Sequence, residues 1–464
     1  MNRLFNIIPL ILICTNCINH KDPSVSEDKL ISQINVQESQ KTEEEKIAQL
    51  LRDSLASLPQ GFRYQGNRSV DPNRPPVVFQ FPDTLPVREY KLSEIASELE
   101  YIVIKTSRDS TLFIPRVSVA MGTDIIVCYG LHGVELFDRQ GNHIKTVLKN
   151  RGLSMRNGQP SGFAIKELVG IPFTDISLFN DSFIYHFHNG PEKKESVIRV
   201  DPDLGLSAHI QLGETISENP AAGTRIKEVQ GMEFINKLGF YQLGDGLWAA
   251  FENKWLSGTK GDLLTLYGPS GDTLCQFKDY DRIRDYPGGP YRNTDNEFKY
   301  HYKKTFSFKP AHNDTLFRVI PPNRLLPTYV FDFGVRKVQL MEGLISSNSL
   351  KGKNIGYELY ETERHLFYVY SRNRAIWGYY RPEDRNFFTL IDKSNHQIHH
   401  ISSIKSTEDG IQNDLDGGLP FWPDGVNEEG FPFMYLSGAD FKKKSVSKRI
   451  NGLADNDIVV ILAK

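Results

Sequence analysis

The stretch from Asn413 to Gly418 has the clearest chemical pattern in the sequence, because Asp414 and Asp416 alternate directly before two glycines. Alternating carboxylates before glycine are typical of the first half of a calcium loop, where hard oxygen ligands surround the cation. No acidic residue follows where an EF-hand places its bidentate glutamate. The alternative is a tight turn whose aspartates cap backbone amides. We expect no cofactor, and calcium at these two aspartates is the one exception that the pattern indicates.

Aromatic and basic residues gather in loop-like stretches. One long polar stretch contains Tyr286, Tyr291 and Arg292, and two others contain Trp377 and Trp422. Exposed aromatic rings stack on the apolar faces of sugars or peptides while neighbouring charges form hydrogen bonds. We therefore take these five residues as candidate ligand-binding residues. The alternative is that the rings pack between β-sheets.

Several function classes lack their sequence signatures. The chain has no nucleophile elbow, P-loop, dinucleotide fingerprint or HExxH zinc motif. Its formal net charge is −2, and Lys and Arg are dispersed along the chain. Because no basic stripe is present for a phosphate backbone, we expect no nucleic-acid partner.

The first 17 residues have the pattern of an export signal. An apolar run from Leu4 to Ile13 follows a short cationic start and is too short to span about 30 Å of hydrocarbon as a helix. Polar sequence begins directly after Cys17, and this junction resembles the lipobox of bacterial lipoproteins, in which the cysteine is acylated. Cys14 and Asn16 stand where the pattern prefers other residues. We expect lipidation of Cys17; the alternative is an ordinary signal peptide that is cleaved nearby.

Residues 18–86 have the composition of a flexible tether. Ser, Glu, Lys and Gln dominate at first, and apolar residues are too few for a core. Within the tether, apolar residues recur at helical spacing near 42–58, and Thr42 with Glu45 makes a capping box. We predict one helix there, followed by a Pro- and Gly-rich loop that leads into the folded domain at 87.

Beyond residue 87 one type of hairpin recurs, with two β-rich runs separated by Gly, Pro, Asn or Asp turn residues. The hairpins lie roughly 50 to 75 residues apart, which suits a four-stranded blade with its loops. Further strand-like runs precede most of them. The hairpins cover 134–148, 197–212, 263–277, 315–331 and 387–401.

This repetition predicts that 87–464 is a single all-β domain, a six-bladed β-propeller in which five hairpin units and a C-terminal unit each form a blade. A propeller has to close, since an open row of blades would expose apolar faces and unpaired strand edges. The continuous apolar runs 101–106 and 458–463 are the predicted closing strands. Seven blades or a split sandwich are the alternatives.

Four segments resemble a family of six-bladed β-propeller lipoproteins from Bacteroides and related Bacteroidetes. The resemblance covers about 90–464 and implies a propeller behind a lipoprotein signal peptide. It implies no activity, because the family's function is unknown. The segments are YKLSEIASELEYIVIKT (90–106), LFDRQGNHIKTVL (136–148), NDTLFRVIPPNRLLPTYVFDFG (313–334) and DLDGGLPFWP (414–423).

The function that we expect is a non-catalytic binding or scaffold module for a glycan, peptide or protein partner. The protein would be exported and held in the cell envelope, at the outer membrane, by its lipid anchor. The alternative is a metal-dependent, lactonase-like hydrolase or lyase with its site at the central channel. The absence of catalytic motifs favours the binding module, although a propeller fold alone assigns no activity.

Overall fold

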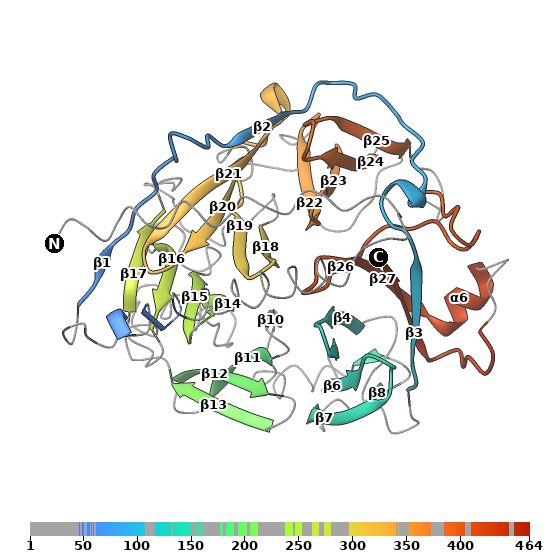
Figure 1. The fold of residues 1–464 in the computed structure, drawn as a ribbon, viewed down its shortest axis with the longest axis horizontal. Helices are drawn as coiled ribbons and strands as arrows, with labels where there is room; N and C mark the ends of the chain where they lie inside the picture. Colours follow the sequence, from blue (N-terminus) through green and yellow to red (C-terminus); the bar gives the residue numbers. More distant parts are fainter. Residues whose placement is uncertain are drawn as a thin grey trace, which may run out of the picture. The chain divides into compact units, whose positions relative to one another are not determined.

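The computed structural model describes scattered positions between 46 and 59 and most of residues 62–464. Its longest gaps inside the second part are 107–116, 161–176, 212–236, 253–261, 280–296, 343–351 and 373–384. The chain divides into two units, Met1–Pro59 and Gln60–Lys464. The second unit is an all-β β-propeller with few helices. In the view of Figure 1 its sheets are arranged around a common centre.

The propeller is built from antiparallel four-stranded sheets in which consecutive strands are neighbours. The first contains β4 (Val117–Met121), β5 (Ile125–Gly130), β6 (Gly133–Asp138) and β7 (His143–Lys149). The next contains β10 (Ser177–Phe179), β11 (Ser182–Asn189), β12 (Lys194–Asp201) and β13 (Gly205–Gln211). It is followed by β14 (Lys237–Gly244), β15 (Leu247–Glu252), β16 (Asp262–Tyr267) and β17 (Thr273–Lys278).

The later sheets repeat this pattern. One contains β18 (Phe298–Tyr302), β19 (Thr305–Lys309), β20 (Thr315–Ile320) and β21 (Arg324–Asp332), and one contains β22 (Asn354–Glu361), β23 (His365–Arg372), β24 (Arg385–Asp392) and β25 (Ile398–Ser403). The last joins β26 (Gly425–Val426), β27 (Pro432–Ser437) and β28 (Ile458–Ala463) to β3 (Leu99–Ile104). A separate two-stranded sheet pairs β8 (Met155–Arg156) with β9 (Gln159–Pro160). The five predicted hairpins are confirmed as β6–β7, β12–β13, β16–β17, β20–β21 and β24–β25.

Neighbouring sheets pack face to face around the ring. Side chains alternate across each strand, so every sheet presents apolar residues to the sheet on either side. One buried cluster joins β14–β17 to β18–β21, and a second joins β18–β21 to β22–β25. Two more clusters join β22–β25 to the sheet of β28 and that sheet to β4–β7. Five blades are thus described with their side-chain packing, and β10–β13 is a further sheet whose β10 and β11 lie against β14.

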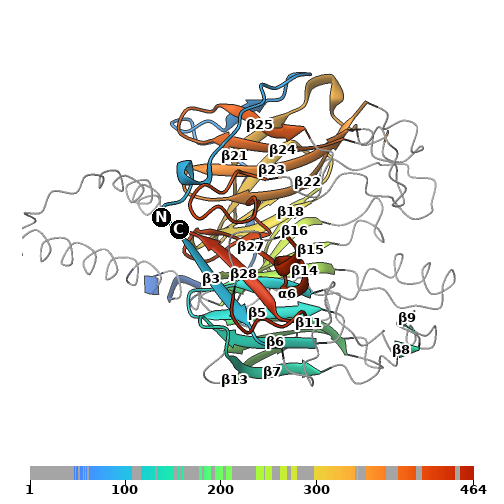
Figure 2. The same cartoon turned by 90° about the vertical axis from the view of Figure 1, so that its right-hand side faces the viewer.

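The two ends of the propeller unit meet in one sheet, as the apolar runs predict. β28 pairs antiparallel with β3, with Val459 opposite Val103 and Val460 opposite Ile102. All six residues of β28 are buried, because alternate side chains enter the clusters on both of its faces. The pairing is visible in Figure 2, where β3 lies beside β28. Closure of this kind leaves no open end to the row of sheets.

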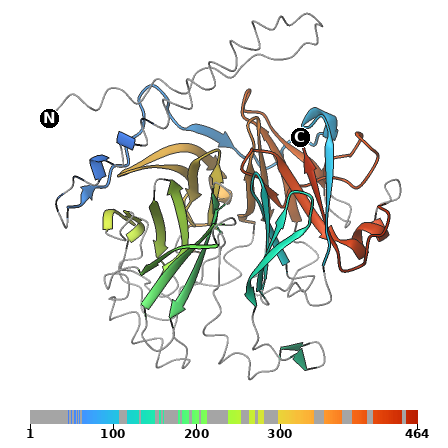
Figure 3. The ribbon, with the colours of Figure 1, turned by 60° about the horizontal axis from the view of Figure 1, so that its bottom comes forward.

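The structure corrects the predicted start of the folded domain. Residues 60–86 were predicted to be a loop of the tether, but they belong to the propeller unit. β1 (Tyr64–Gln65) pairs parallel with β17, and β2 (Val77–Gln80) pairs parallel with β21. Isolated bridges then join Val87 to His400 and Lys91 to Gln412 before the chain enters β3. We call residues 62–91 the strap, because they follow the outer edges of consecutive sheets (blue in Figures 1 and 3).

The side chains of β2 explain why the strap packs against the edge of a sheet. Phe79 is 1% exposed and packs against Tyr329 and Phe331, while Val78 on the other face of β2 is 50% exposed. A short strand that buries one aromatic ring and covers an unpaired sheet edge is stabilised in spite of its Pro- and Asn-rich surroundings. In the first unit, the described residues Lys46, Gln49, Leu50 and 53–55 are helical, within the range predicted for a helix. No described helix has the length and apolar character needed to cross a membrane.

Candidate functional site

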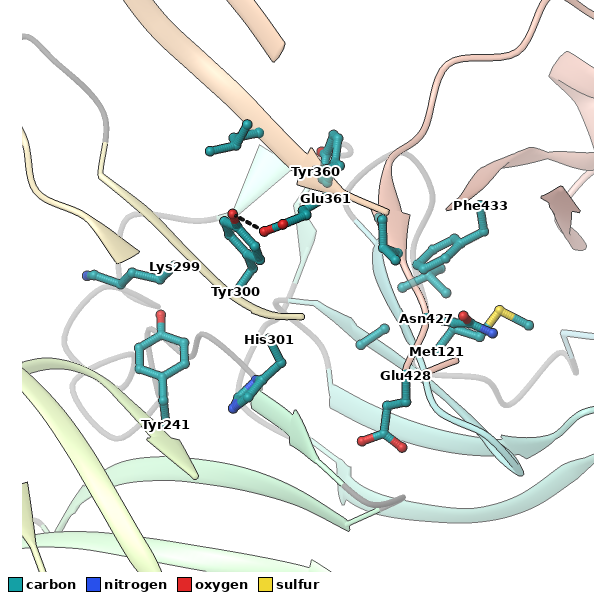
Figure 4. Close-up of a pocket in the computed structure, with 15 residues that line it drawn as sticks. Met121, Tyr241, Lys299, Tyr300, His301, Tyr360, Glu361, Asn427, Glu428 and Phe433 are labelled. Carbon is teal, nitrogen blue, oxygen red and sulfur yellow. Dashed lines mark hydrogen bonds between the residues drawn. The ribbon is translucent and has the colours of Figure 1, made fainter. Parts of the chain in front are cut away.

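A cavity of about 200 Å³ lies where the innermost strands of several sheets converge. Its walls come from β4, β14, β18, β22 and the β26–β27 hairpin, so five sheets contribute to it. Figure 4 shows side chains from these sheets facing the same space. The residues that line it are Val119, Ala120, Met121, Tyr241, Lys299, Tyr300, His301, Leu359, Tyr360, Glu361, Gly425, Val426, Asn427, Glu428 and Phe433.

One wall of the cavity is apolar and closely packed. Met121 from β4 and Phe433 from β27 are both 2% exposed and belong to the cluster that joins their two sheets. Gly425 permits this packing, since a Cβ atom at that position would lie 2.5 Å from Cζ of Phe433. Glycine at the start of β26 therefore allows the hairpin backbone to approach the ring of Phe433.

Two charged groups on the cavity wall, Lys299 and Glu361, have partners of opposite charge within the protein. Lys299 Nζ lies 2.8 Å from Glu297 Oε2. His301 donates from Nε2 to the carbonyl oxygen of Gln242 at 2.7 Å, and burial lowers its pKa to about 4. The imidazole is therefore uncharged at neutral pH. The cavity consequently presents phenol rings, a neutral imidazole and the carboxylate of Glu428 beside its apolar wall.

Glu361 is the centre of a buried hydrogen-bond network. Its side chain is 0% exposed and accepts hydrogen bonds from Arg318 Nη2 at 2.7 Å and Lys393 Nζ at 2.8 Å. The hydroxyls of Tyr300 and Tyr329 donate to it at 2.8 and 3.1 Å. Burial alone would raise the pKa of Glu361, but the charges of Arg318 and Lys393 hold it below the ordinary value. The network ties β22–β25 to β18–β21 next to the cavity.

A second pair of acidic side chains, Glu358 and Asp424, has a different environment. Glu358 lies on β22, Asp424 directly precedes β26, and these two strands are neighbours in the ring. Both residues are exposed to solvent, although neighbouring protein atoms displace part of the water around each carboxylate. Burial and the charge of Asp424 raise the pKa of Glu358 to about 7, and burial raises the pKa of Asp424 to about 6. Both groups therefore titrate near neutral pH, a property that is concentrated at functional sites.

Three half-buried aromatic residues adjoin the acidic pair: Trp422, Tyr360 and Tyr435. The indole N–H of Trp422 lies beside Glu358, and the backbone N–H of Tyr435 donates to Asp424 Oδ2 at 2.8 Å. Burial and then the charges of Glu358 and Asp424 raise the pKa of Tyr360 well above its ordinary value. Tyr360 also lines the cavity, so the acidic pair and the cavity share a wall.

The structure places Asp414 and Asp416 in a turn where both carboxylates accept hydrogen bonds. The backbone N–H and hydroxyl of Ser93 donate to Asp414 at 3.0 and 2.7 Å. Asp416 accepts from the hydroxyl of Tyr101 at 2.7 Å and from Asn413 Nδ2 at 2.8 Å. The turn thus links the segment before β26 to Ser93, just after the strap, and to β3.

Of the predicted ligand-binding residues, Trp422 is described. Its ring packs edge-on against Phe367 and Phe388, with centroid distances of 5.4 and 4.8 Å, so it belongs to the seam between two sheets and also adjoins Glu358. The other four predicted ligand-binding residues lie outside the described residues, namely Tyr286, Tyr291, Arg292 and Trp377. The predicted lipidation site, Cys17, lies outside them as well.

Sequence reasoning did not find Glu358, Asp424 or the cavity. The two acidic residues lie 66 positions apart in the chain, and no spacing rule joins them before the fold is known. Within the described residues, no group of three or more His, Cys, Asp or Glu side chains could hold a metal ion. Cys128 and Cys275 are free and buried, and burial raises the pKa of the Cys275 thiol to about 11.

Comparison with solved structures finds distant matches. A member of the DUF4221 family from Bacteroides vulgatus is 9% identical with a TM-score of 0.40, over 80% of this chain and 97% of that chain. A protein of unknown function from Bacteroides caccae is 10% identical with a TM-score of 0.34, over 66% and 94%. The WD40 domain of Neurospora crassa Pan2 is 10% identical with a TM-score of 0.34, over 75% and 88%.

The comparison with curated proteins finds no match. The comparison with family models finds one that covers most of the chain, at residues 59–165 and 217–447. These matches begin at the start of the propeller unit and include β22, the acidic pair and the hairpin of β26 and β27. The chain therefore belongs to the family described as "Domain of unknown function (DUF4933)".

Proposed function

We propose that this chain is an exported envelope protein, anchored to the outer membrane through a lipid on Cys17, whose six-bladed propeller binds a partner without catalysing a reaction. The partner is a glycan, a peptide or a protein segment. The binding site is the axial cavity and the acidic pair that adjoins it.

The convergence of five sheets on one cavity supports this proposal most directly. Ligand sites in proteins are concave and largely apolar, with a few convergent polar groups, and the cavity has this character. Lys299, Glu361 and His301 already have partners in the protein, so the aromatic rings, the hydroxyls and the carboxylate of Glu428 are what the cavity offers to a ligand. That combination suits stacking and hydrogen bonding more than bond cleavage.

Six blades are proposed because β10–β13 repeats the four-stranded order of the sheets on either side of it. The lipid anchor is proposed from the sequence of residues 1–17. Several acyl chains on one cysteine would hold the protein far more firmly than a single chain does.

Binding at the axis is tested with a variant that fills the cavity. Ala120 lies on the cavity wall in β4, so Ala120→Phe should obstruct the space. The matched control is Ile144→Phe on β7 of the same sheet, where the side chain is 44% exposed. Both full-length variants and the wild-type protein are screened on a glycan array and in pull-downs of envelope extracts.

We expect a ligand that binds the wild-type protein to bind the control variant with the same affinity. Its affinity for Ala120→Phe should be lower by about tenfold or more. Equal binding by all three proteins would place the site elsewhere. Turnover of an ester or a uronide by the purified protein would show that it is an enzyme and would contradict the non-catalytic function.

The anchor is tested by labelling cells with a fatty-acid analogue. Wild-type protein should be labelled, and Cys17→Ala should not, while Cys14→Ala should retain the label. If Cys17→Ala were labelled and Cys14→Ala were not, the lipid would be attached to Cys14. If the wild-type protein were not labelled, the protein would have no lipid anchor.

A further inference from the structure

The axial cavity has the size of one six-membered ring. Its volume is about 200 Å³. A protein cavity of roughly 150 Å³ takes up benzene, whereas sites for drug-sized molecules measure roughly 300–1,000 Å³. The cavity therefore has room for one substituted ring and not for several consecutive residues of a ligand.

Two walls of the cavity differ in polarity (Figure 4). Met121 and Phe433 lie on one side of the space, and Tyr241, Tyr300 and His301 lie on the other. The first wall is apolar, while the second adds phenol oxygens and an imidazole to its ring surface. A ring that matches both walls has an apolar face and a polar edge.

The rings of the polar wall are held in position by the protein. His301 donates from Nε2 to a backbone carbonyl of β14 at 2.7 Å, and the ring of Tyr241 stacks on Phe306 with centroids 4.6 Å apart. The hydroxyl of Tyr300 donates to Glu361 at 2.8 Å, and its oxygen retains the capacity to accept a hydrogen bond. A ligand that enters the cavity does not have to order these side chains, which favours binding.

Glu428 brings a carboxylate to the same space from the turn between β26 and β27. Asn427 fixes this turn: its Oδ1 accepts from the N–H of Phe431 at 2.8 Å, and its Nδ2 donates to Glu429 at 3.0 Å. Asn427 is 4% exposed, so the turn is anchored in the protein. A carboxylate has about four acceptor positions, so Glu428 can accept from hydroxyl groups of a ligand in addition to its contacts within the protein.

These features favour a sugar ring over the aromatic ring of a peptide. A pyranose has an apolar C–H face and several hydroxyls around its edge, so it matches both walls. A phenylalanine ring would cover Glu428 and the oxygen of Tyr300 without donating a hydrogen bond to either, and burial of polar groups in this way is unfavourable. A pyranose supplies hydroxyl donors for both.

We propose that the axial cavity binds a single pyranose ring of a glycan. The apolar face of the ring packs against Met121 and Phe433, and its hydroxyls donate to Glu428 and to the polar wall. The rest of the glycan stays outside the cavity. This inference rests on the proposed axial binding site and identifies its ligand as a carbohydrate.

The test uses the full chain and small uncharged probes. Methyl glycosides of glucose, galactose, mannose and N-acetylglucosamine represent the pyranose, and N-acetyl amides of phenylalanine and tyrosine represent the aromatic ring of a peptide. Binding is measured by saturation-transfer NMR and by calorimetry for the wild-type protein, Ala120→Phe and Glu428→Gln. The matched controls are Ile144→Phe and Glu89→Gln, since Ile144 is exposed on β7 and Glu89 is exposed on the strap.

We expect at least one glycoside to bind the wild-type protein and both controls with a dissociation constant on the order of millimolar, as is usual for a ligand of about a dozen heavy atoms. Its affinity should fall about tenfold or more in Ala120→Phe, which fills the space, and about fivefold or more in Glu428→Gln, which places an amide where the carboxylate accepts. The aromatic amides should bind more weakly than this glycoside. Thermal unfolding establishes that each variant is folded, and Glu428→Gln alone suffices if Ala120→Phe does not fold.

The proposal is overturned if no glycoside binds the wild-type protein, or if the glycoside binds either folded variant as tightly as the wild-type protein. It is also overturned if an aromatic amide binds more tightly than every glycoside. In that case, loss of amide binding in Ala120→Phe would retain the axial site with a peptide as its ligand. If Ala120→Phe changed neither probe binding nor the capture of glycans and proteins, the proposed axial site itself would be wrong.

Discussion

Glu361 shows how one residue can hold two blades together beside the cavity. Its carboxylate is fully buried and has two cationic and two phenolic partners. Replacing it by alanine would leave Arg318 and Lys393 as enclosed charges without their anion. We expect Glu361→Ala to lower the free energy of unfolding by about 3 kcal/mol or more, measured by urea denaturation.

The matched control is Glu363→Ala. Glu363 is two positions along the chain, and its side chain is 69% exposed, 3.5 Å from Lys303. A surface pair of this kind contributes about 0–1 kcal/mol. If both variants lost equally little stability, Glu361 would not be the structural centre that we describe.

Glu358 and Asp424 should make the stability of the protein depend on pH in a defined direction. Their folded-state pKa values of about 7 and about 6 lie above the ordinary values of 4.5 and 3.8. The folded protein thus retains protons that the unfolded chain has released, so the stabilisation is complete in acid and is lost as pH rises through 6 and 7. Ionised carboxylates without a cation then oppose folding.

We therefore expect Glu358→Gln to melt at the same temperature as the wild-type protein at about pH 4, below the ordinary pKa, and on the order of 2 °C higher at about pH 8. Three histidines, His301, His365 and His400, have pKa values lowered to about 4, so their protonation weakens the fold in acid. The variant is therefore compared with the wild-type protein at each pH. Glu89→Gln should show no such divergence. A variant less stable than the wild-type protein at pH 8 would mean that the carboxylate has a stabilising partner.

At the scale of elements, the strap adds short parallel strands to sheets that are otherwise antiparallel meanders. Phe79→Ala should cost about 3–5 kcal/mol, because the ring is buried against Tyr329 and Phe331. Val78→Ala, one residue away and half exposed, should change stability by less than about 0.5 kcal/mol. Chemical denaturation of both variants makes the comparison. If Phe79→Ala left the stability unchanged, residues 60–86 would belong to the tether and not to the propeller.

The elements differ in how visible they are in the sequence. The hairpins were predictable because their turn residues and β-rich runs are local signals, and Tyr101 and Val460 lie in continuous apolar runs that indicate buried strands. The strap was missed because β1 and β2 are only two and four residues long and lie among Pro, Gly and Asn. Such strands are stabilised by the sheet edge they cover, which is tertiary information.

The same limit applies to the candidate site. Trp422 was predicted to bind a ligand because it is an aromatic residue in a loop-like stretch. In the structure it packs in the seam between two sheets and also lies beside Glu358. Glu358 and Asp424 were invisible because their relationship depends on the order of sheets around the ring. A search for acidic residues on adjacent inner strands becomes feasible once a propeller is recognised, and that search would have found the pair.

At the scale of the whole molecule, the site exists only because the ring closes. The cavity and the acidic pair use β4, β22 and β26, and these strands are neighbours because β3 and β28 bring the two ends of the unit into one sheet. An unclosed row of sheets would separate β4 from β26 and dismantle the cavity wall of Met121 and Phe433.

A cross-strand disulfide tests this closure most directly. Val103 and Val459 are register partners, at a spacing that a disulfide can bridge in an antiparallel pair. In the control pair, Val103→Cys with Ile461→Cys, the second cysteine is displaced by about 7 Å along β28. Mild oxidation of each double variant is followed by mass spectrometry, while native Cys128 and Cys275 stay buried. We expect the 103–459 disulfide to form almost completely and the 103–461 disulfide hardly at all; equal yields, or no disulfide in either protein, would contradict the closed ring.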